Sequence, residues 1–426
     1  MLIRSLTSAS LLLVTSAFAA SAFAAPPTSG LPMASPESVG MSSDRLKRID
    51  ALMQRYIDDE LVAGTVTLVA RKGKVVHFNA QGVKDVASGE AMTADTIFRM
   101  ASMTKPIASV ALMMLYEEGW FQLYDPISNW LPAFKNMNIE VPSPDSDAVT
   151  LQPAKTAITF AHVLTHTAGF QNSYRGDIPA YQSTMAVQEG EMLDSWTDRL
   201  ATLPLRYEPG TRWEYSSATS VVGRLVEVIS GLSLDEYLQQ RIFTPLQMTD
   251  TFFYLPENKL NRFSSLYGPD ASNENRMMLT ETGDSNSNYF KGPRNFYSGS
   301  GGLVSTAHDY IRFQQMMLNG GELDGVRLLG PKTVEQIFKN HTGNLPLWLS
   351  GPGVGFGLGY SVVLDSAVAN TSDTEGSVSW GGAFGTIFWI DPEEELIAIM
   401  LTQIRPYTHL GQRQNFHNVV NQAIID

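Results

Sequence analysis

The sequence has no cysteine, no block of basic residues and no long hydrophobic run, and each absence excludes a class of protein. Without cysteine there is no disulfide bond and no thiolate metal site, and we expect neither a metal nor a cofactor. There are 30 Lys and Arg residues against 43 Asp and Glu, a formal net charge of −13. We therefore expect no nucleic-acid partner, and attraction to an anionic membrane surface is disfavoured.

The hydrophobic run nearest the start of the chain, Leu11 to Phe18, is too short to span a membrane, which takes about 20 apolar residues. It follows a single charge, Arg4, and precedes Ala22-Phe23-Ala24, which offers small residues at the two positions read by signal peptidase. We therefore expect residues 1–24 to be a signal peptide cut after Ala24. The mature protein would carry no stable membrane anchor and would be exported, to the periplasm or beyond.

What is present includes an unusually apolar helix that begins near Ser102. Proline is tolerated in the first helical turn, so Pro106 predicts a helix start within about one turn of Ser102, and Gly119 predicts its end. Residues Ile107–Leu115 are apolar nearly all round, which indicates a buried helix. Lys105 shares a helical face with Ser102, and partial burial lets an amine lose its proton and act as a base. A capping serine with a first-turn lysine is the ordinary alternative.

The whole chain, with 43% hydrophobic and 17% charged residues, has the composition of a globular protein. β-rich runs occur near both ends, at 65–70, 74–80, 359–364, 377–381, 386–391 and 396–402. Further helices are predicted at 43–59, 160–169, 192–203, 216–230, 234–242, 306–318, 332–338 and 411–425. Segments 142–153 and 267–293 are rich in turn-forming residues and are expected to be exposed loops.

These runs predict an α+β fold with one antiparallel sheet built from both chain ends. The terminal helices would cover one face, and the helix that begins near Ser102 would cover the other, together with a helix-rich middle domain. We expect residues 25–118 and 356–426 to form the sheet domain and residues 119–355 the helix-rich domain. A substrate cleft would lie between them, where pockets usually form.

Two further motifs follow the Ser-x-x-Lys pair. Tyr215 stands directly before a predicted helix, with Ser216 or Ser217 as its cap, although a tyrosine that only anchors a loop is the alternative. Paired glycines follow Trp380 at the end of a predicted strand, which lets the backbone approach another group closely. A plain bulge or tight turn would explain them equally well. Neither motif indicates a reaction by itself.

Taken together and in this order, the three motifs resemble the serine β-lactamase and penicillin-binding superfamily, and within it the class C-like family VIII carboxylesterases. The stretches Leu164–Gly169, Pro209–Thr211 and Ser300–Leu303 support the resemblance, which covers nearly the whole mature chain. It implies a β-lactamase/transpeptidase-like fold and an acyl-enzyme mechanism. The absence of Gly-x-Ser-x-Gly argues against a Ser-His-Asp hydrolase, and His166 is expected to be structural.

The resemblance also implies roles for individual residues. Ser102 would be the nucleophile, Lys105 and Tyr215 a coupled proton relay, and the backbone N–H groups of Ser102 and Ala383 the oxyanion hole. The residues expected to bind substrate are Trp380, Gly381, Gly382, Ser217 and Phe384.

Two departures from the lactamase pattern favour an esterase. Trp380 stands where class C enzymes have a cation for the substrate carboxylate, and Ser217 stands where they have Asn. We expect hydrolysis of short-chain, small-molecule carboxylic esters. Weak β-lactamase action, D-amino-acid peptidase or amidase action, acyl transfer and a non-catalytic ligand-binding protein remain alternatives. The sequence indicates no oligomeric state.

Overall fold

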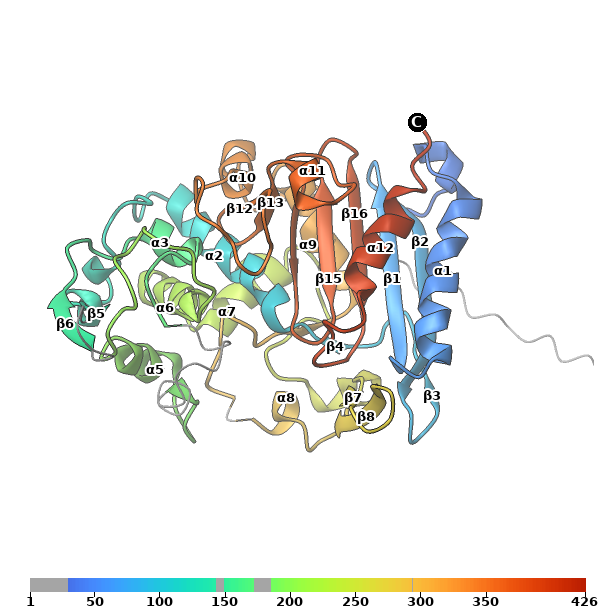
Figure 1. Ribbon diagram of the computed structural model, residues 1–426, viewed down its shortest axis with the longest axis horizontal. Helices are drawn as coiled ribbons and strands as arrows, with labels where there is room; N and C mark the ends of the chain where they lie inside the picture. Colours follow the sequence, from blue (N-terminus) through green and yellow to red (C-terminus); the bar gives the residue numbers. More distant parts are fainter. Residues whose placement is uncertain (1–29, 143–148, 172–184, 293) are drawn as a thin grey trace, which may run out of the picture.

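A computed structural model describes residues 30–142, 149–171, 185–292 and 294–426 (Figure 1). The predicted signal peptide, residues 1–24, lies outside these ranges. Within them, no helix is both long enough and apolar enough to cross a membrane.

An eight-stranded antiparallel sheet forms the centre of the molecule, with strand order β12-β13-β14-β15-β16-β1-β2-β3. Strand β16 pairs with β15 on one side and with β1 on the other, so that Val66 lies opposite Leu401. This confirms the predicted α+β class and the sheet built from both chain ends. The strands are β1 (Gly64–Arg71), β2 (Lys74–Asp85), β3 (Glu90–Ala91), β12 (Val354–Phe356), β13 (Ser361–Val363), β14 (Val378–Gly381), β15 (Ile387–Asp391) and β16 (Leu396–Leu401).

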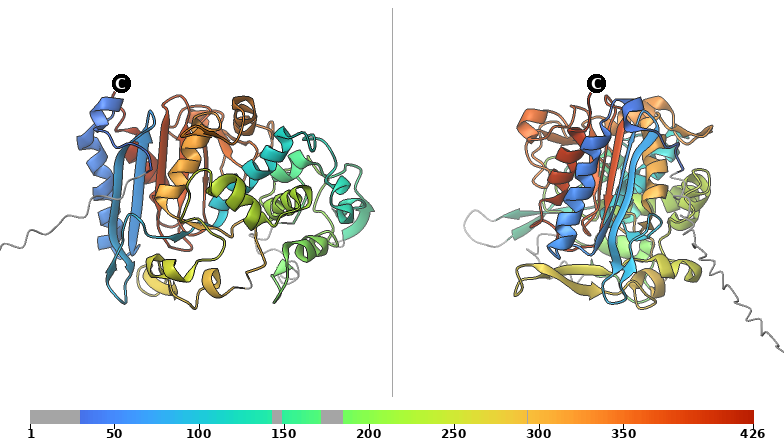
Figure 2. Two further views of the ribbon diagram at one scale, coloured as in Figure 1. Left: turned by 180° about the vertical axis from the view of Figure 1, so that it is seen from behind. Right: turned by 90° about the vertical axis from the view of Figure 1, so that its right-hand side faces the viewer.

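Helices cover both faces of the sheet (Figure 2). Helices α1 (Ser43–Asp58) and α12 (Gln412–Asn421) lie side by side on one face and pack with sheet residues such as Trp389. Helix α9 (Ala307–Leu318) packs against β16 and β1 on the other face. The terminal helices therefore cover one face, as predicted. Because α9 falls within residues 119–355 and yet packs on the sheet, the limits of the two domains stay a prediction.

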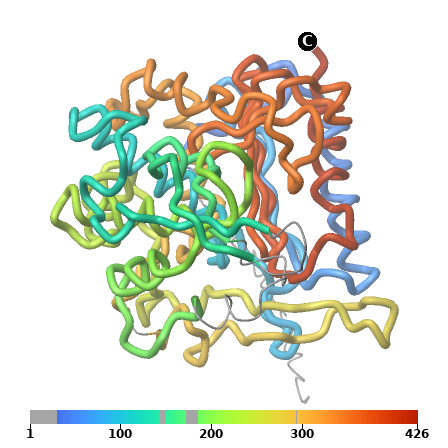
Figure 3. The backbone as a smooth tube through the Cα atoms, turned by 60° about the vertical axis from the view of Figure 1, so that its left-hand side comes forward, coloured from blue at the N-terminus to red at the C-terminus, as the bar shows by residue number. Residues whose placement is uncertain are grey.

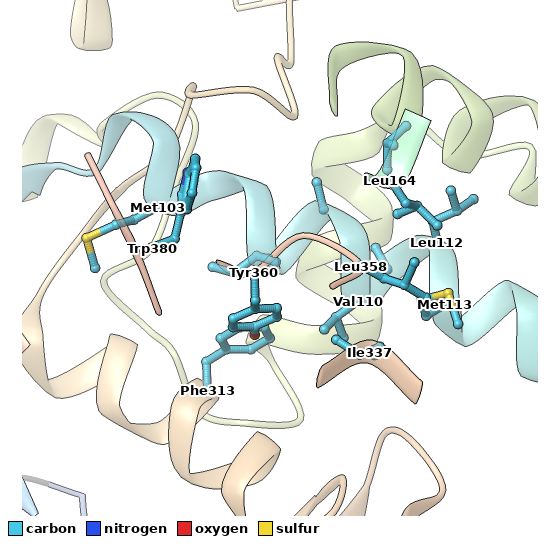
Figure 4. Packing of buried hydrophobic residues seen from close by; sticks show 14 of the residues in the cluster. Met103, Val110, Leu112, Met113, Leu164, Phe313, Ile337, Leu358, Tyr360 and Trp380 are labelled. Carbon is cyan, nitrogen blue, oxygen red and sulfur yellow. The ribbon is translucent and has the colours of Figure 1, made fainter. Parts of the chain in front are cut away.

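Helix α2 (Thr104–Glu117) runs through the larger hydrophobic core and is buried over its first three turns. Figure 4 shows Val110 of this helix among side chains from other elements, including Phe313 of α9 and Tyr360, which precedes β13. Gly119 has φ +83°, a left-handed conformation that glycine adopts readily, and it lies just past the helix end as predicted. The buried apolar surface holds the start of α2 in one position.

The middle of the chain supplies the remaining helices. A π-helix at Gln239–Phe243 continues α7, so the predicted helix at 234–242 is present but is not α-helical throughout. The α-helices are α3 (Phe160–Leu164), α5 (Leu193–Leu200), α6 (Ala218–Ser230), α7 (Leu234–Leu238), α8 (Asn288–Lys291), α10 (Pro331–Phe338) and α11 (Ser366–Ala369).

Two segments predicted as loops contain hairpins. Strands β5 (Asn138–Pro142) and β6 (Val149–Pro153) pair with each other, and so do β7 (Leu266–Asp270) and β8 (Arg276–Glu281), the yellow hairpin along the lower edge of Figure 3. The turn-forming residues that suggested loops lie partly between and after these short strands. Tertiary contacts add to the pairing, because the buried Arg99 forms an ion pair with Glu281.

One predicted helix end was wrong, and one strand was missed. The helix predicted to reach Gly169 ends at Leu164, because His166 takes a left-handed φ of +57° that no helix tolerates. Strand β12 was not predicted, since three residues are too few to show a period-two pattern.

Candidate active site

Ser102 lies on a tight turn between β4 (Phe98–Arg99) and α2, in a short 3-10 helix that spans Ala101–Met103. Ala101 has φ +45°, a left-handed conformation that costs a residue other than glycine about 1–3 kcal/mol. A Cβ added to Gly301 would lie 3.4 Å from the Ala101 backbone, so a neighbouring loop packs closely on this turn. The turn delivers Ser102 to the start of the buried helix, where the sequence predicted it.

Lys105 is buried beside Ser102, with 1% of its surface exposed. Its Nζ donates to Ser102 Oγ at 3.2 Å and to the backbone carbonyl of Ser300 at 2.7 Å. Within the described ranges no carboxylate forms an ion pair with it, and burial lowers the pKa of Lys105 to about 7. A large fraction of the amine is therefore neutral near pH 7 and able to accept the Ser102 proton.

Tyr215 completes the group from the other side. It stands just before α6, which packs against α2, and its ring centroid lies 4.6 Å from Lys105 Nζ. The Tyr215 hydroxyl accepts a hydrogen bond from Trp380 Nε1 at 3.4 Å. The structure thus brings together Ser102, Lys105 and Tyr215 from distant parts of the chain, although their catalytic roles stay predictions.

A cluster of aromatic rings packs around the ring of Tyr215 and forms a wall beside the site. The Trp380 ring centroid lies 5.3 Å from that of Tyr215, and Phe356 meets Trp380 edge-on at 5.2 Å. Trp213 stacks on Tyr215 at 6.1 Å and contacts Trp348, which is 36% exposed, at 6.0 Å. A largely apolar surface therefore leads from Trp348 towards the relay. The sequence assigned roles only to Trp380 and Tyr215 of this wall, because packing between distant segments brings the other three rings here.

The turn after β14 brings the end of this strand against the turn that carries Ser102. Gly382 N–H donates to the carbonyl of Thr386 at 2.9 Å, and a Cβ on Gly382 would lie 2.4 Å from the carbonyl oxygen of Met100. Glycine is needed because the two backbones touch. Among the described residues, no acceptor binds the N–H of Ser102 or that of Ala383. Both donors are therefore available to an oxyanion, and their role as the hole stays a prediction.

Two other predicted substrate-binding residues, Ser217 and Phe384, make fewer contacts with the group around Tyr215. Ser217 occupies the N-cap position of α6, but its side chain makes no cap bond; Ser216 Oγ accepts the N–H of Ala218 instead. The Phe384 ring lies 5.9 Å from the Arg405 guanidinium carbon. In the part of the chain that the structure describes, it makes no ring contact with Tyr215 or Trp380. Contact of either residue with a substrate stays a prediction.

Each of the two histidines nearest the site accepts a hydrogen bond from a backbone N–H. His162 and His166 are four residues apart, a metal-ligand spacing that the expectation of no metal overlooks. His166, however, lies beyond the end of α3, and each Nδ1 faces a backbone N–H, from Thr159 and Ser216 respectively. Burial lowers the pKa of His166 well below its ordinary range, and Lys105 adds to this shift. Nowhere in the described ranges do three or more His, Asp or Glu side chains gather as for a metal ion.

Ser300 is a site residue whose role the sequence does not reveal. Its carbonyl accepts from Lys105, and its Oγ accepts from Ser220 Oγ at 2.9 Å. Ser300 belongs to a stretch that supported the family resemblance, but the pattern does not say that a backbone oxygen is the active part. Together these groups suit acyl transfer: a hydroxyl, a neutral base, a phenol and two free N–H donors.

Comparison with known proteins gives consistent results. A family model described as Beta-lactamase matches residues 49–419. Over 371 residues the chain is 35% identical to Protein Rv1367c of Mycobacterium tuberculosis (84% of this chain, 89% of that protein). It is 29% identical to Esterase EstB of Burkholderia gladioli (83% and 89%). The solved structure of EstCE1, "a hydrolase with promiscuous acyltransferase activity", superposes with a TM-score of 0.74 at 25% identity, over 89% of this chain and 99% of that one.

Proposed function

The chain belongs to the beta-lactamase family, and on this premise we propose that it is a serine carboxylesterase that forms an acyl-enzyme on Ser102. The match over residues 49–419 confirms the predicted resemblance and the β-lactamase/transpeptidase-like fold, and the esterase relatives make the chain a serine hydrolase. The substrate we propose is an uncharged, short-chain carboxylic ester. The observation that carries the proposal is the contact of Trp380 with Tyr215, at the place where a lactamase holds a cation.

In the proposed reaction, Ser102 Oγ attacks the ester carbonyl while its proton passes to the neutral amine of Lys105, 3.2 Å away. The oxyanion accepts hydrogen bonds from the N–H groups of Ser102 and Ala383, and each such donor lowers the barrier by about 3 kcal/mol. The bond from carbon to the alcohol oxygen breaks, and the relay of Lys105 and Tyr215 returns the proton to the leaving alcohol. A water then attacks the acyl-enzyme and loses its proton to the same relay. The bond from carbon to Ser102 Oγ breaks, the relay returns the proton to Oγ, and the acid leaves.

The surroundings of Trp380 support an ester rather than a β-lactam. Moving a carboxylate out of water costs free energy, so a carboxylated lactam needs a cation in the site to pair with its anion. Trp380 supplies an apolar face, and its indole N–H points to Tyr215. The cation that lies against Gly381 is Arg413, and both of its terminal nitrogens already bind groups of the protein. An uncharged ester avoids this cost and gains about 0.8 kcal/mol per buried CH₂.

Acyl transfer to an alcohol is the second candidate function. EstCE1 combines hydrolase and acyltransferase activity, and the two reactions differ only in whether water or an alcohol attacks the acyl-enzyme. The aromatic wall that ends at the partly exposed Trp348 offers an apolar surface on which an alcohol could compete with water. We also propose that the protein is exported after cleavage behind Ala24, which the mass of the mature protein tests.

A substrate panel with matched variants tests the proposal. We expect kcat/KM for p-nitrophenyl acetate or butyrate well above that for nitrocefin, and almost no action on a D-Ala-D-Ala peptide. A fluorophosphonate should label Ser102, and Ser102→Ala should lose labelling and turnover together. Ser109→Ala is the control, because Ser109 lies on the same helix with a buried, unpaired hydroxyl and should keep both.

Each other outcome selects an alternative. Faster cleavage of nitrocefin than of every ester identifies a β-lactamase, and cleavage of the peptide identifies a peptidase. An ester product that outpaces the acid when an alcohol is added identifies an acyltransferase. Labelling without turnover of any substrate would leave a binding protein.

A further inference from the structure

Arg413 is a half-buried cation that reaches from α12 over the turn that carries Ala383. Its Nη2 donates to the carbonyl of Gly382 at 2.5 Å and to that of Thr386 at 2.7 Å, and its Nη1 donates to the hydroxyl of Tyr407. The guanidinium also lies 3.8 Å from the centroid of the Tyr407 ring. No described carboxylate pairs with it, whereas the buried Arg99 forms an ion pair with a glutamate.

The carbonyl of Gly382 and the N–H of Ala383 are the two ends of one peptide group. That group is planar, and in the trans form the C=O and N–H bonds point in opposite directions. Fixing the oxygen on one side therefore fixes the direction of the hydrogen on the other. A charged donor on the oxygen also polarises the group and makes its N–H a stronger donor. Since the Ala383 N–H has no acceptor among the described residues, this gain is available to a ligand.

Other contacts make the turn a clamped unit rather than a free loop. The carbonyl of Thr386 accepts from Gly382 N–H as well as from Arg413, and Gln412 Nε2 donates to the carbonyl of Gly385 at 3.3 Å. On the other side, Gly382 packs against Met100, directly before the nucleophile turn. The first two residues of α12 thus hold the turn at both ends against the nucleophile.

We propose that Arg413 is a positioning residue, which aims and polarises the Ala383 N–H through the Gly382 carbonyl and so sets the strength of the oxyanion hole. The proposal rests on the acyl-enzyme mechanism given above. A neutral side chain could hold the turn in place. Partial burial of a guanidinium without a carboxylate partner costs desolvation free energy, and the positive charge offsets this cost only when a negative charge develops nearby.

The test compares Arg413→Gln, Arg413→Lys and wild type. For p-nitrophenyl butyrate we expect kcat to fall about 10²-fold in Arg413→Gln, the size of losing one oxyanion donor, while KM stays within about threefold. Arg413→Lys keeps the charge and can reach one carbonyl, so its kcat should lie between those of wild type and Arg413→Gln. The Ki of a butyl boronic acid, which forms a tetrahedral oxyanion on serine, should rise in parallel with the loss of kcat/KM.

Arg312→Gln is the matched control. Arg312 is buried and, like Arg413, donates to two backbone carbonyls, those of Leu246 and Gly30. It makes no bond to the turn and forms an ion pair with Asp324. Its replacement should lower the melting temperature and leave kcat and the boronate Ki unchanged. If Arg413→Gln behaves in the same way, Arg413 is only structural and the proposal is overturned.

The labelling rate separates this proposal from the proposed function. A fluorophosphonate places an oxygen in the same hole whatever the natural substrate is, so Arg413→Gln should slow labelling of Ser102 even if no ester is turned over. Unchanged labelling in a folded Arg413→Gln overturns the role of Arg413 alone. Absence of ester turnover in wild type, with normal labelling, overturns the esterase alone. Should Arg413→Gln fail to fold, Arg413→Lys decides by the same two measurements.

Discussion

Replacing Lys105 by methionine should change how the stability of the protein depends on pH. Lys105 is buried, and burial lowers its pKa to about 7, from about 10.4 in an unfolded chain. The protonated amine is thus disfavoured in the native state by on the order of 5 kcal/mol. Methionine has a similar length and carries no ionisable proton, so Lys105→Met removes the effect and keeps most of the packing.

The sign follows from proton binding in the two states. Between about pH 7 and pH 10 the unfolded chain keeps its proton on Lys105 while the native protein has lost it, so the free energy of unfolding rises with pH. Below pH 7 both states bind the proton, and the penalty is present in full and constant. Integration from pH 7 to pH 9 gives a gain of about 2 kcal/mol for wild type that Lys105→Met lacks.

Urea unfolding of both proteins at pH 5, 6, 7, 8 and 9 measures the difference. Other titrating groups are shared and cancel, and any packing change in the variant is a constant offset. The difference should be flat from pH 5 to pH 6 and should change by about 2 kcal/mol from pH 7 to pH 9. Equal slopes throughout would refute the reasoning, because they would mean that Lys105 keeps its proton in the native protein. The kcat/KM of wild type should also rise with pH through about 7.

Four further substitutions test the site. Lys105→Ala and Tyr215→Phe should each lower kcat at least ~10²-fold, and the double variant should be little worse than the worse single, whereas additive losses in steady-state assays would mean separate steps. Trp380→Phe removes the N–H that binds the Tyr215 hydroxyl but keeps an apolar ring, so kcat should fall by up to about tenfold at constant KM. An unchanged kcat would show that this hydrogen bond does not contribute to catalysis. Gly382→Ala places a Cβ 2.4 Å from the Met100 carbonyl oxygen, so melting temperature and ester hydrolysis should both drop, and wild-type melting would show that the turn shifts freely.

The parts of the molecule that depend on local pattern were predictable from the sequence. Pro106 and Gly119 mark the two ends of the nucleophile helix, because each acts on its own backbone. The β-rich runs at both chain ends predicted the shared sheet, because strands need partners and the middle of the chain is mostly helical.

The parts that depend on tertiary packing were not predictable. The carbonyl of Ser300 reaches Lys105 across 195 residues of sequence, and any residue type could supply that oxygen. Arg413 is one polar residue on an amphipathic helix, and nothing in its neighbourhood distinguishes it from a solvated arginine. The β7–β8 hairpin resembles a loop in the sequence because its short strands gain stability from partners elsewhere, such as Arg99.

The position of β16 in the middle of the sheet affects the order in which a growing chain acquires its properties. Strand β1 leaves the ribosome early, but its partner β16 is made only after residue 396, so the sheet cannot close until synthesis is almost finished. A fragment that stops after residue 380 contains Ser102 and Tyr215 but has neither the Ala383 turn nor α12, and we expect a fluorophosphonate to leave it unlabelled. Catalysis is then the last property that the growing chain acquires.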